Sequence, residues 1–360
     1  LPDGRVPLHP LVISEGAASL LPDEVRQALV WTIELDDVAS VTSTRVERAL
    51  VRSRRAWAYD EAQSAVEEGT APPPIALLAE VGPKRQTLER HRGGVSLDLP
   101  DQVVVGAGEA YRLAFRAPLP VEGWNAQISL LTGMEAARLM LAGGVGVLRT
   151  LPAPDMEAIE HVRRKAKALG VAWPEGASYA DVIGALHADI DAEAVLLVQA
   201  ARLLRGAAYE AFVDVPAVVP THPAVAAPYA HVTAPLRRLV DRFGNEAALA
   251  ACAGTPVPDW ARDAMLELPE IMREARQREG AADRMAIDLM EAAVLSGRIG
   301  HTFEGVITSI ARDRAQVQLR EPAVVVSAPA GRRSIGDPVT VEVVAADPVT
   351  RTVEVSLHAR

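Results

Sequence analysis

The chain has 360 residues, of which 49% are hydrophobic and 23% are charged, a composition typical of a globular protein with a sizeable buried core. Cys252 is the only cysteine, which excludes an internal disulfide and a cysteine-based zinc or iron–sulfur site. The net charge of −10 argues against a generally basic coat for nucleic acid, but it leaves room for a local basic groove. No apolar run approaches the roughly 20 residues that cross a membrane, so we expect no membrane segment.

The first third of the sequence predicts strands and short helices. A β-rich run at 30–35 and a return strand at 38–51 flank Asp36-Asp37, which we interpret as a hairpin turn. A short helix is expected to open at Tyr59, followed by a break at the three prolines 72–74. The remaining strands expected in this part lie at 95–99, 103–105 and 111–116.

The middle of the chain predicts helices, because Ala, Leu and Arg recur there at helical spacing between Gly and Pro breaks. These helices are expected at 125–142, 156–169, 179–186 and 192–204. A loop rich in Pro and Ala follows at 216–228. Further helices begin near Pro235 and end near Ser296, where a Gly-containing hinge at 296–300 is expected.

The last 60 residues are patterned differently from the rest. Alternating apolar and polar residues predict short strands at 302–310, 315–319, 323–327, 338–345 and 352–357. A small barrel is the common solution for so many short strands, and the OB fold is the commonest such barrel. We therefore predict an α+β protein with one domain at 1–296 and a five-stranded OB-fold barrel at 300–360.

The most informative segment precedes one of the predicted helices and reads Tyr229-Ala230-His231-Val232-Thr233-Ala234-Pro235-Leu236-Arg237-Arg238-Leu239-Val240-Asp241. Proline is favoured in the first turn of a helix, so Pro235 predicts a helix start. Arg237 and Arg238 would then stand beside free backbone N–H groups, an arrangement that binds phosphate. The alternative is a surface helix in which Arg238 and Asp241, three residues apart, form an ion pair.

This segment resembles the Tyr-x-His-Phe-Thr-Ser-Pro-Ile-Arg-Arg-Tyr-x-Asp signature of the ribonuclease II (RNB domain) family. Further family motifs are matched in the same order at 7–10, 14–20, 59–63 and 92–100. Residues 300–357, with Gly305-Val306 and Gly336-Asp337, resemble the S-one-type RNA-binding OB domain of this family. The resemblance implies a divergent bacterial member, with an RNB-type catalytic domain whose N-terminal part is missing from the chain.

The resemblance also implies an activity. The family hydrolyses single-stranded RNA from the 3′ end and releases 5′-mononucleotides with Mg²⁺. Two Mg²⁺ ions can activate the attacking water and stabilise the leaving oxygen, and Mg²⁺ takes oxygen ligands. In the family these ligands are four aspartates just upstream of the motif that matches 7–10. Because no such segment lies between Leu1 and Arg360, we expect the metal ligands upstream of Leu1 and expect no metal ligand within the chain.

Two other acidic segments are alternative candidates for a metal site. Asp36-Asp37 is more simply the hairpin turn described above. In the segment 187–193, His187, Asp189, Asp191 and Glu193 alternate and would face one way on a strand. That segment lies between two predicted helices, where Asp189 or Asp191 is a natural N-cap.

The resemblance assigns roles residue by residue. Arg237 matches the arginine that helps to stabilise the scissile phosphate, a role that suits the planar, permanently charged guanidinium. The neighbouring signature positions, expected near the RNA backbone, are Tyr229, His231, Thr233 and Arg238. Asp241 matches the signature acid, which we expect to orient an arginine rather than bind metal. A general-base role for His231 is the remaining alternative.

Some positions depart from the family pattern. Asn125 and Gln127 stand where many members carry paired glutamates, and their amides can bond ribose hydroxyls without supplying charge. Leu239 replaces a tyrosine, and Asn245-Glu246 replaces His-Arg. We interpret these differences as divergence rather than as loss of activity.

Two basic clusters fit an RNA path. The first consists of Arg45, Arg48, Arg52, Arg54 and Arg55, and the second of Lys84, Arg85, Arg90 and Arg92. Arg92 also belongs to a family motif and is expected to contact RNA. The alternative for both clusters is an ordinary solvated face.

The leading hypothesis is therefore a 3′-to-5′ exoribonuclease that uses Mg²⁺, binds single-stranded RNA, and is monomeric and cytoplasmic. A catalytically silent RNA-binding clamp on the same scaffold is the alternative. A third reading is a soluble protein in which Arg237 and Arg238 are purely structural. Aspartates upstream of Leu1 would favour the nuclease, and their replacement by Asn or Ser would favour the clamp.

Overall fold

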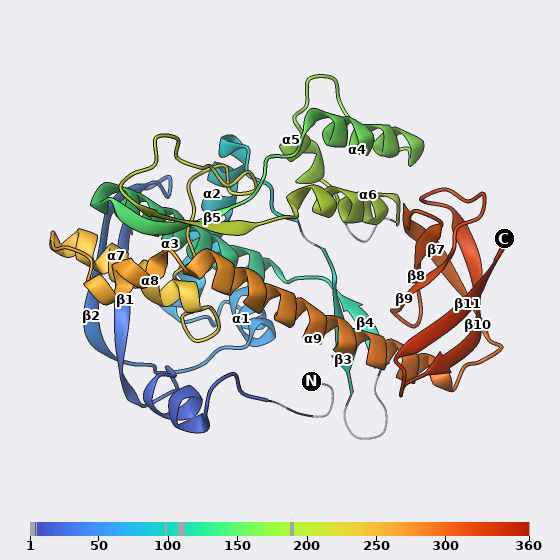
Figure 1. The fold of residues 1–360 in the computed structure, drawn as a ribbon, viewed down its shortest axis with the longest axis horizontal. Helices are drawn as coiled ribbons and strands as arrows, with labels where there is room; N and C mark the ends of the chain where they lie inside the picture. Colours follow the sequence, from blue (N-terminus) through green and yellow to red (C-terminus); the bar gives the residue numbers. More distant parts are fainter. Residues whose placement is uncertain (1–3, 5, 98, 107–111, 188–190, 360) are drawn as a thin grey trace.

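The computed structural model describes residues 4, 6–97, 99–106, 112–187 and 191–359 (Figure 1). Helices and strands are mixed along the chain, as predicted. In chain order the elements are η1 (Val12–Ala17), β1 (Val25–Leu35), β2 (Val41–Arg52), α1 (Tyr59–Glu67), α2 (Pro73–Arg92), β3 (Asp101–Val105), β4 (Arg112–Arg116), α3 (Pro120–Gly143), β5 (Val145–Thr150), α4 (Met156–Ala168), α5 (Tyr179–Ile183), α6 (Asp191–Ala201), η2 (Arg202–Leu204), β6 (Ala208–Val213), α7 (Leu239–Ala253), α8 (Asp259–Met265), α9 (Leu268–Ser296), β7 (Thr302–Ala311), β8 (Arg314–Leu319), β9 (Val325–Pro329), β10 (Pro338–Asp347) and β11 (Thr352–Ala359).

Strands β1 and β2 form the predicted hairpin. They pair antiparallel along their whole length, from Val25 opposite Arg52 to Leu35 opposite Val41. Asp36 makes the turn, because its Oδ1 accepts hydrogen bonds from the backbone N–H groups of Val38 (3.1 Å) and Ser40 (2.7 Å). The interpretation of Asp36-Asp37 as a turn is confirmed.

Helix α3 lies in the middle of the helical part and packs against α2, α7 and β5 (Figure 1). Ala136, Ala137 and Met140 on α3 are fully buried in a cluster that also takes in Phe212 of β6 and Met265 of α8. This cluster fixes α3, α7 and β5 relative to one another. The segment that resembles the family signature runs between β6 and α7, directly over this core.

Helices α4, α5 and α6 share a second apolar cluster built on Val162, Ala166, Ile183, Leu196 and Leu197. Helix α6 also packs against β7. Of the acidic segment 187–193, residues 188–190, Asp189 included, lie outside the described residues. The backbone N–H of His187 donates to Glu193 Oε2 (2.6 Å), so the side chain of Glu193, in the first turn of α6, accepts from the segment before the helix.

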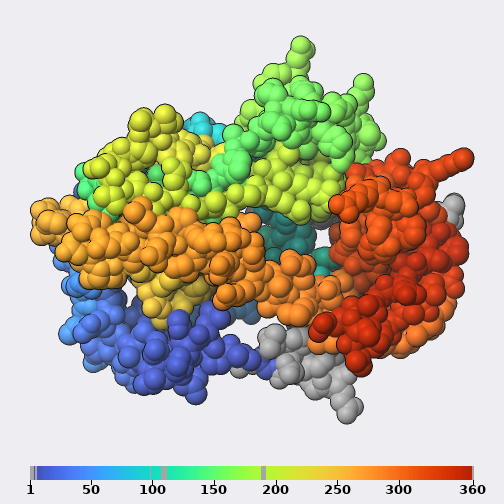
Figure 2. Space-filling model, in the orientation of Figure 1, coloured from blue at the N-terminus to red at the C-terminus, as the bar shows by residue number. Residues whose placement is uncertain are grey.

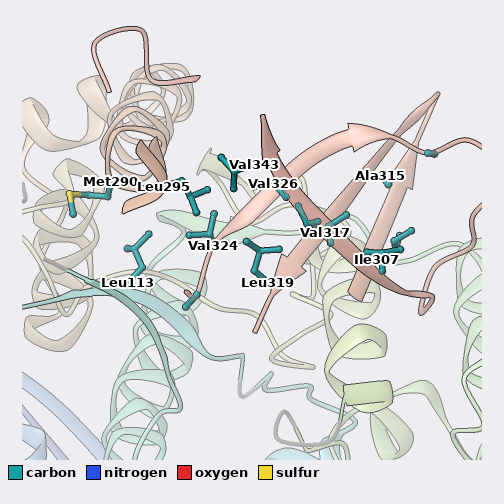
Figure 3. Close-up of a cluster of buried hydrophobic side chains, with 14 residues drawn as sticks. Leu113, Met290, Leu295, Ile307, Ala315, Val317, Leu319, Val324, Val326 and Val343 are labelled. Atoms are coloured by element: carbon teal, nitrogen blue, oxygen red, sulfur yellow. The ribbon is translucent and has the colours of Figure 1, made fainter. Parts of the chain in front are cut away.

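The last five strands form a nearly closed barrel in the order β11-β10-β7-β8-β9, and β11 also contacts β9. In Figure 3, Ile307, Val317, Leu319 and Val343 gather in its interior, and each is fully buried. The predicted five-stranded barrel is confirmed. Its strand positions follow from the alternation, which puts every second side chain of a strand on one face.

The barrel core includes side chains from outside the barrel. Leu113 of β4 and Met290 and Leu295 of α9 belong to the same buried cluster (Figure 3). Figure 2 shows the barrel as a lobe at the right of the molecule, against the end of α9. The barrel is thus packed on the preceding elements, and the domain boundary at 296–300 stays a prediction. None of the helices in the described part is long and apolar enough to cross a membrane.

Candidate functional site

Residues 229–241 form an extended segment and a tight turn before α7. The turn spans Pro235–Arg237, where the carbonyl of Ala234 accepts hydrogen bonds from the N–H groups of Arg237 (3.2 Å) and Arg238 (3.0 Å). Helix α7 begins at Leu239, after Arg238 in an extended conformation (φ −124°, ψ 116°). The prediction of a helix start at Pro235 is wrong, because the extended backbone of Arg238 separates the turn from the helix.

Asp241 holds this turn together. Its side chain is fully buried, and its two oxygens accept from Arg238, Nε to Oδ1 at 2.9 Å and Nη2 to Oδ2 at 2.8 Å. Oδ2 also accepts from the backbone N–H of Ala234 (2.7 Å). Burying a charged carboxylate costs free energy, and the charge is tolerated when hydrogen-bond donors surround it. The ion pair predicted from the three-residue spacing is present, and it fixes Arg238.

Arg237 is placed quite differently from its neighbour. Its side chain is exposed, and within the described part of the chain its guanidinium makes no hydrogen bond or ion pair. The turn therefore presents one free cation next to one neutralised cation. A free, exposed guanidinium on a rigid backbone can take two oxygens of a phosphate at once.

Asn245 supports the same turn from α7. Its Nδ2 donates to the carbonyls of Val232 (2.8 Å) and Asp241 (2.8 Å), and its Oδ1 accepts from Trp31 Nε1 (3.0 Å). The neighbouring departure, Glu246, is paired with Arg48 of β2. Asn245 and Glu246 thus connect α7 to the β1–β2 hairpin, which gives both departures a structural role.

Four aromatic and imidazole rings pack under the turn. His231 Nδ1 shares a hydrogen bond of 2.7 Å with the hydroxyl of Tyr209 on β6. The ring of Tyr229 meets His231 edge-on at 5.4 Å between centroids and His222 at 5.9 Å. Gly133 of α3 leaves room for this cluster, since a Cβ there would overlap the Tyr229 ring and lie 2.5 Å from the Ala230 carbonyl oxygen.

His231 is held neutral. Burial, followed by the charges of Arg238, Arg149, Arg237 and His222, lowers its pKa to about 3. An imidazole with so low a pKa is a weak base at pH 7, where a general base works best with a pKa near the operating pH. The alternative that His231 acts as a general base is therefore disfavoured, and the ring serves as a neutral hydrogen-bonding partner of Tyr209.

Arg149 of β5 was missed by the sequence reasoning. Its guanidinium lies 4.6 Å from the centre of the Tyr209 ring, and its Nη1 donates to the Ala208 carbonyl at 3.4 Å. Burial lowers the pKa of Arg149, and the charges of Arg276 and Arg238 add to this effect. The available signal was a lone arginine in an apolar strand. With Arg237 and Arg238 it makes the surroundings of the ring cluster positive.

The other predicted site residues are distributed around this cluster. Arg92 donates from Nε to the Val225 carbonyl (3.2 Å), in the loop that carries His222. Its Nη2 is buried without a hydrogen-bond partner among the described residues. Thr233 is exposed, 3.5 Å from Arg238 Nη2. The structure thus brings Tyr229, His231, Thr233, Arg237 and Arg238 together and leaves Arg92 at the edge.

Asn125 and Gln127 lie apart from the turn, at the start of α3. Gln127 is 3% exposed and donates from Nε2 to Glu89 Oε2 of α2 (2.6 Å), so its amide is directed inside the helix pair. Asn125 is exposed and donates to the hydroxyl of Tyr59 (3.0 Å). The RNA contacts predicted for these amides stay predictions, and the burial of Gln127 argues against an RNA contact by its side chain.

In both basic clusters, more of the positive charges are paired with carboxylates than the sequence indicated. In the first, Arg45 pairs with Glu47, Arg48 with Glu246 and Arg55 with Glu61. In the second, Lys84 pairs with Glu80, while Arg85 is buried and donates to the Ala39 carbonyl (2.9 Å). The ordinary solvated face is the better interpretation of the first cluster.

A Mg²⁺ site is not formed by the residues around the turn. Asp241 is the acid of this site, and both of its oxygens are already occupied by Arg238 and the Ala234 N–H. Among the described residues, no three His, Cys, Asp or Glu side chains group in a way that could hold a metal. The exposed guanidinium of Arg237 is the group of this site that is available to an anion such as phosphate.

Comparison with known proteins identifies the class. The RNB domain model matches residues 1–246, and the model of the RNase II-type exonuclease C-terminal S1 domain matches residues 301–358. The chain therefore belongs to the RNB family of ribonucleases and ends in an S1 domain of the RNase II type. The bacterial branch stays a prediction.

Individual relatives are distant. Ribonuclease R of Escherichia coli (strain K12) is 24% identical over 336 residues, which cover 86% of this chain and 40% of that protein. Mycoplasma genitalium RNase R, solved in complex with ribose methylated single-stranded RNA, superposes with a TM-score of 0.82 at 17% identity, covering 98% of this chain and 61% of that chain. The fold is also that of yeast Ssd1, a pseudonuclease, with a TM-score of 0.69 at 16% identity, covering 100% of this chain and 45% of that chain. The chain spans 25–47% of the length of the curated relatives it matches.

Proposed function

We propose that this chain supplies the RNA-holding and phosphate-stabilising part of an exoribonuclease that cleaves single-stranded RNA from the 3′ end and releases 5′-mononucleotides. The observation that carries the proposal is Arg237, which is exposed and has no ion-pair or hydrogen-bond partner among the described residues, on a turn that Asp241 and Arg238 hold rigid. RNB-family membership supports a hydrolytic ribonuclease, and the finer details of direction and product come from the family resemblance.

The proposed role of Arg237 is electrostatic. Negative charge grows on the phosphoryl oxygens as water attacks, and a donor already fixed in place stabilises that charge without reorganisation. Arg238 cannot share this role equally, because its guanidinium is committed to Asp241. His231 is neutral and adds no charge, and Arg238 is paired with Asp241, so most of the positive potential at the turn comes from Arg237 and Arg149.

The proposed cofactor is Mg²⁺, which would supply the nucleophilic water. The described residues do not hold it, and the resemblance implies aspartates upstream of the motif at 7–10 as its ligands. Residues 1–360 alone are therefore expected to bind RNA without hydrolysing it, and addition of the family's aspartate segment should restore Mg²⁺-dependent release of mononucleotides. Robust metal-dependent cleavage by residues 1–360 alone would contradict this division.

The decisive experiment concerns Arg237 in the protein that includes the aspartate segment. Arg237→Ala should lower kcat by roughly 10²–10³-fold, the effect of losing one preorganised donor, with a much smaller change in RNA affinity. Arg237→Lys should rescue poorly, since an ammonium cannot reproduce the planar fork. The matched control is Arg278→Ala on the exposed face of α9, where the arginine pairs with Glu274. Equal losses in affinity and rate, with full rescue by Lys, would reduce Arg237 to a simple binding residue.

An RNA-binding clamp without catalysis is the second candidate. The similarity to the pseudonuclease Ssd1 favours it, because this fold exists in a protein described as inactive. RNA binding that persists with no mononucleotide release, even with the aspartate segment present and Mg²⁺ supplied, would establish the clamp. The proposed exoribonuclease is also expected to be monomeric and cytoplasmic. Analytical sedimentation would test the monomeric state, and cell fractionation would test the location.

A further inference from the structure

A basic hollow lies outside the signature turn, the turn at 235–237 within the segment 229–241 that resembles the family signature. It measures about 390 Å³ and opens between α4, the α6–η2 segment and β7 of the barrel. Its polar lining is dominated by His161, Arg164, Lys165 and Arg202. Figure 1 shows α4 next to α6, with the barrel strand β7 beside α6.

Arg164, Lys165 and Arg202, the cations of this hollow, form no ion pair among the described residues. The pKa of His161 is lowered by burial and by Lys165 and Arg164, and Glu157 partly opposes that shift. No carboxylate of the described residues lies within ion-pair distance of these four side chains. Of the two acids that line the hollow, Asp155 caps α4 by accepting from the Ala158 N–H (2.6 Å), and Glu157 is exposed. Arg163, one position earlier on α4 than Arg164, does have a partner in Glu160. The absence of compensation is thus particular to the face that lines the hollow.

One of these cations is held in place, and another has a buried donor without a partner among the described residues. Lys165 Nζ donates to Gln199 Oε1, and Gln199 Nε2 in turn donates to the Thr308 carbonyl of β7. This bridge fixes the ammonium group between the helices and the barrel. Arg202 Nε is buried and has no hydrogen-bond partner among the described residues. A buried donor without a partner is costly, and an anion that accepts from it would remove the cost.

The electrostatics agree with this geometry. Burial lowers the pKa of Lys165, and the charge of Arg202 lowers it further. The pKa of Arg202 is lowered by burial and by the charge of Arg205. The cations therefore repel one another in a partly desolvated place, where a bound anion gains the most from them.

We propose that this hollow is a binding site for a phosphate group, separate from the signature turn. An ammonium and a guanidinium that converge on one cavity match the several acceptor oxygens of a phosphate. The phosphate belongs either to the backbone of an RNA held along the barrel or to a free phosphate compound. The site does not depend on hydrolysis, so it can fail while the proposed nuclease function holds, and the reverse.

The test uses residues 1–360 with inorganic phosphate as the probe in isothermal titration calorimetry. The Lys165→Gln/Arg202→Gln double variant should bind phosphate at least about tenfold more weakly, the effect of losing one charge-assisted hydrogen bond. The matched control is Arg163→Gln on the same helix. Arg163 pairs with Glu160 and lies over the Trp173 ring. The control should bind within about twofold of the unchanged chain.

A second arm identifies the source of the phosphate. Binding of a single-stranded oligonucleotide is measured at several salt concentrations, and each lost phosphate contact flattens the slope of log K against log salt by about 0.7. A flatter slope in the double variant assigns the site to the RNA backbone, and an unchanged slope with lost phosphate binding assigns it to a free phosphate compound. Arg164→Gln, at an exposed position of the hollow, provides a variant that leaves the packing intact and should weaken phosphate binding in the same direction. No saturable phosphate binding, or equal binding by the folded variants and the control, overturns the proposal.

Discussion

The signature turn and the C-terminal barrel are stabilised by different interactions. At the turn, a buried carboxylate, an amide and backbone donors fix a segment that has no regular secondary structure. In the barrel, apolar side chains that alternate along five strands fill one interior. At the turn, the polar contacts leave the cation of Arg237 exposed for a ligand. The barrel is held by apolar contacts, and the sequence 300–360 contains seven arginines and seven acidic residues, which balance in charge. The region with the candidate phosphate-binding group, the signature turn, is therefore the one whose conformation depends on a few polar contacts.

The strongest test of this contrast is removal of the polar anchor. Asp241→Ala should destabilise the turn by about 3–5 kcal/mol, because Arg238 loses its partner in a partly buried place. Hydrogen exchange followed by mass spectrometry should show lost protection in residues 229–241 and unchanged protection in the barrel. Asp259→Ala on α8, whose carboxylate is 83% exposed, should change protection very little. Uniform loss across both regions would contradict their separation.

The corresponding test of the barrel is a substitution that creates a cavity in its core. Ile307 is fully buried, and Ile307→Ala should cost about 3 kcal/mol, within the range for large-to-small changes in a core. Urea unfolding monitored by exchange of the β7–β11 amides measures the effect. Because Leu295 and Met290 of α9 share this core, the end of α9 should lose protection together with the strands. The exposed Ile299→Ala serves as the control, and equal effects of the two changes would refute the apolar account.

Acid should weaken the signature region first. The pKa of His231 is about 3 in the folded chain, below its ordinary value of 6.5, mainly because of burial and then because of Arg238. Between these values the unfolded chain binds the extra proton, so stability falls as pH decreases below 6.5, by about 1 kcal/mol for the first pH unit. Protection of residues 229–241 measured from pH 7 to 5 should decline, and His231→Phe should remove most of that decline. A pH-independent response of the unchanged chain would contradict this assignment.

The junction of the barrel should respond to pH in the opposite direction, with the smallest effect. Burial, and to a lesser degree Asp288, raises the pKa of Glu291, although its Oε1 accepts from Gln102 Nε2 (3.0 Å) and the Val325 N–H (2.9 Å). As pH rises above about 4.5 the unfolded chain loses its proton first, so stability declines up to the folded pKa and then levels off. Glu291→Gln keeps the accepting oxygen and should remove this decline.

Exchange of the Val325 amide measures the effect of Glu291→Gln directly, since that N–H donates to the side chain. Glu354→Gln on an exposed position of β11 is the matched control in the barrel. A variant with the same pH dependence as the unchanged chain would show that Glu291 does not connect α9 to the barrel in the way the geometry indicates.

The sequence by itself determined the features that depend on local order. Alternation specified the five barrel strands, since successive side chains of a strand face opposite sides, and the Asp36 turn followed from its own backbone hydrogen bonds. The three-residue spacing of Arg238 and Asp241 predicted their ion pair, and the order of motifs indicated the RNB family. Each of these signals is contained within a few residues or in their sequence order.

Only the tertiary structure decided which polar groups are free to act. Arg149 on β5 and Tyr209 on β6 meet His231 because β5 and β6 pair, and no spacing in the sequence encodes that contact. Gln127 was expected at an RNA-facing surface but is covered by α2, where it donates to Glu89. The helix α7 starts at Leu239 and not at Pro235, because Arg238 is extended while its side chain pairs with Asp241. Whether a charge is exposed or neutralised depends on side chains distant in sequence, and for that physical reason the site needed the folded chain.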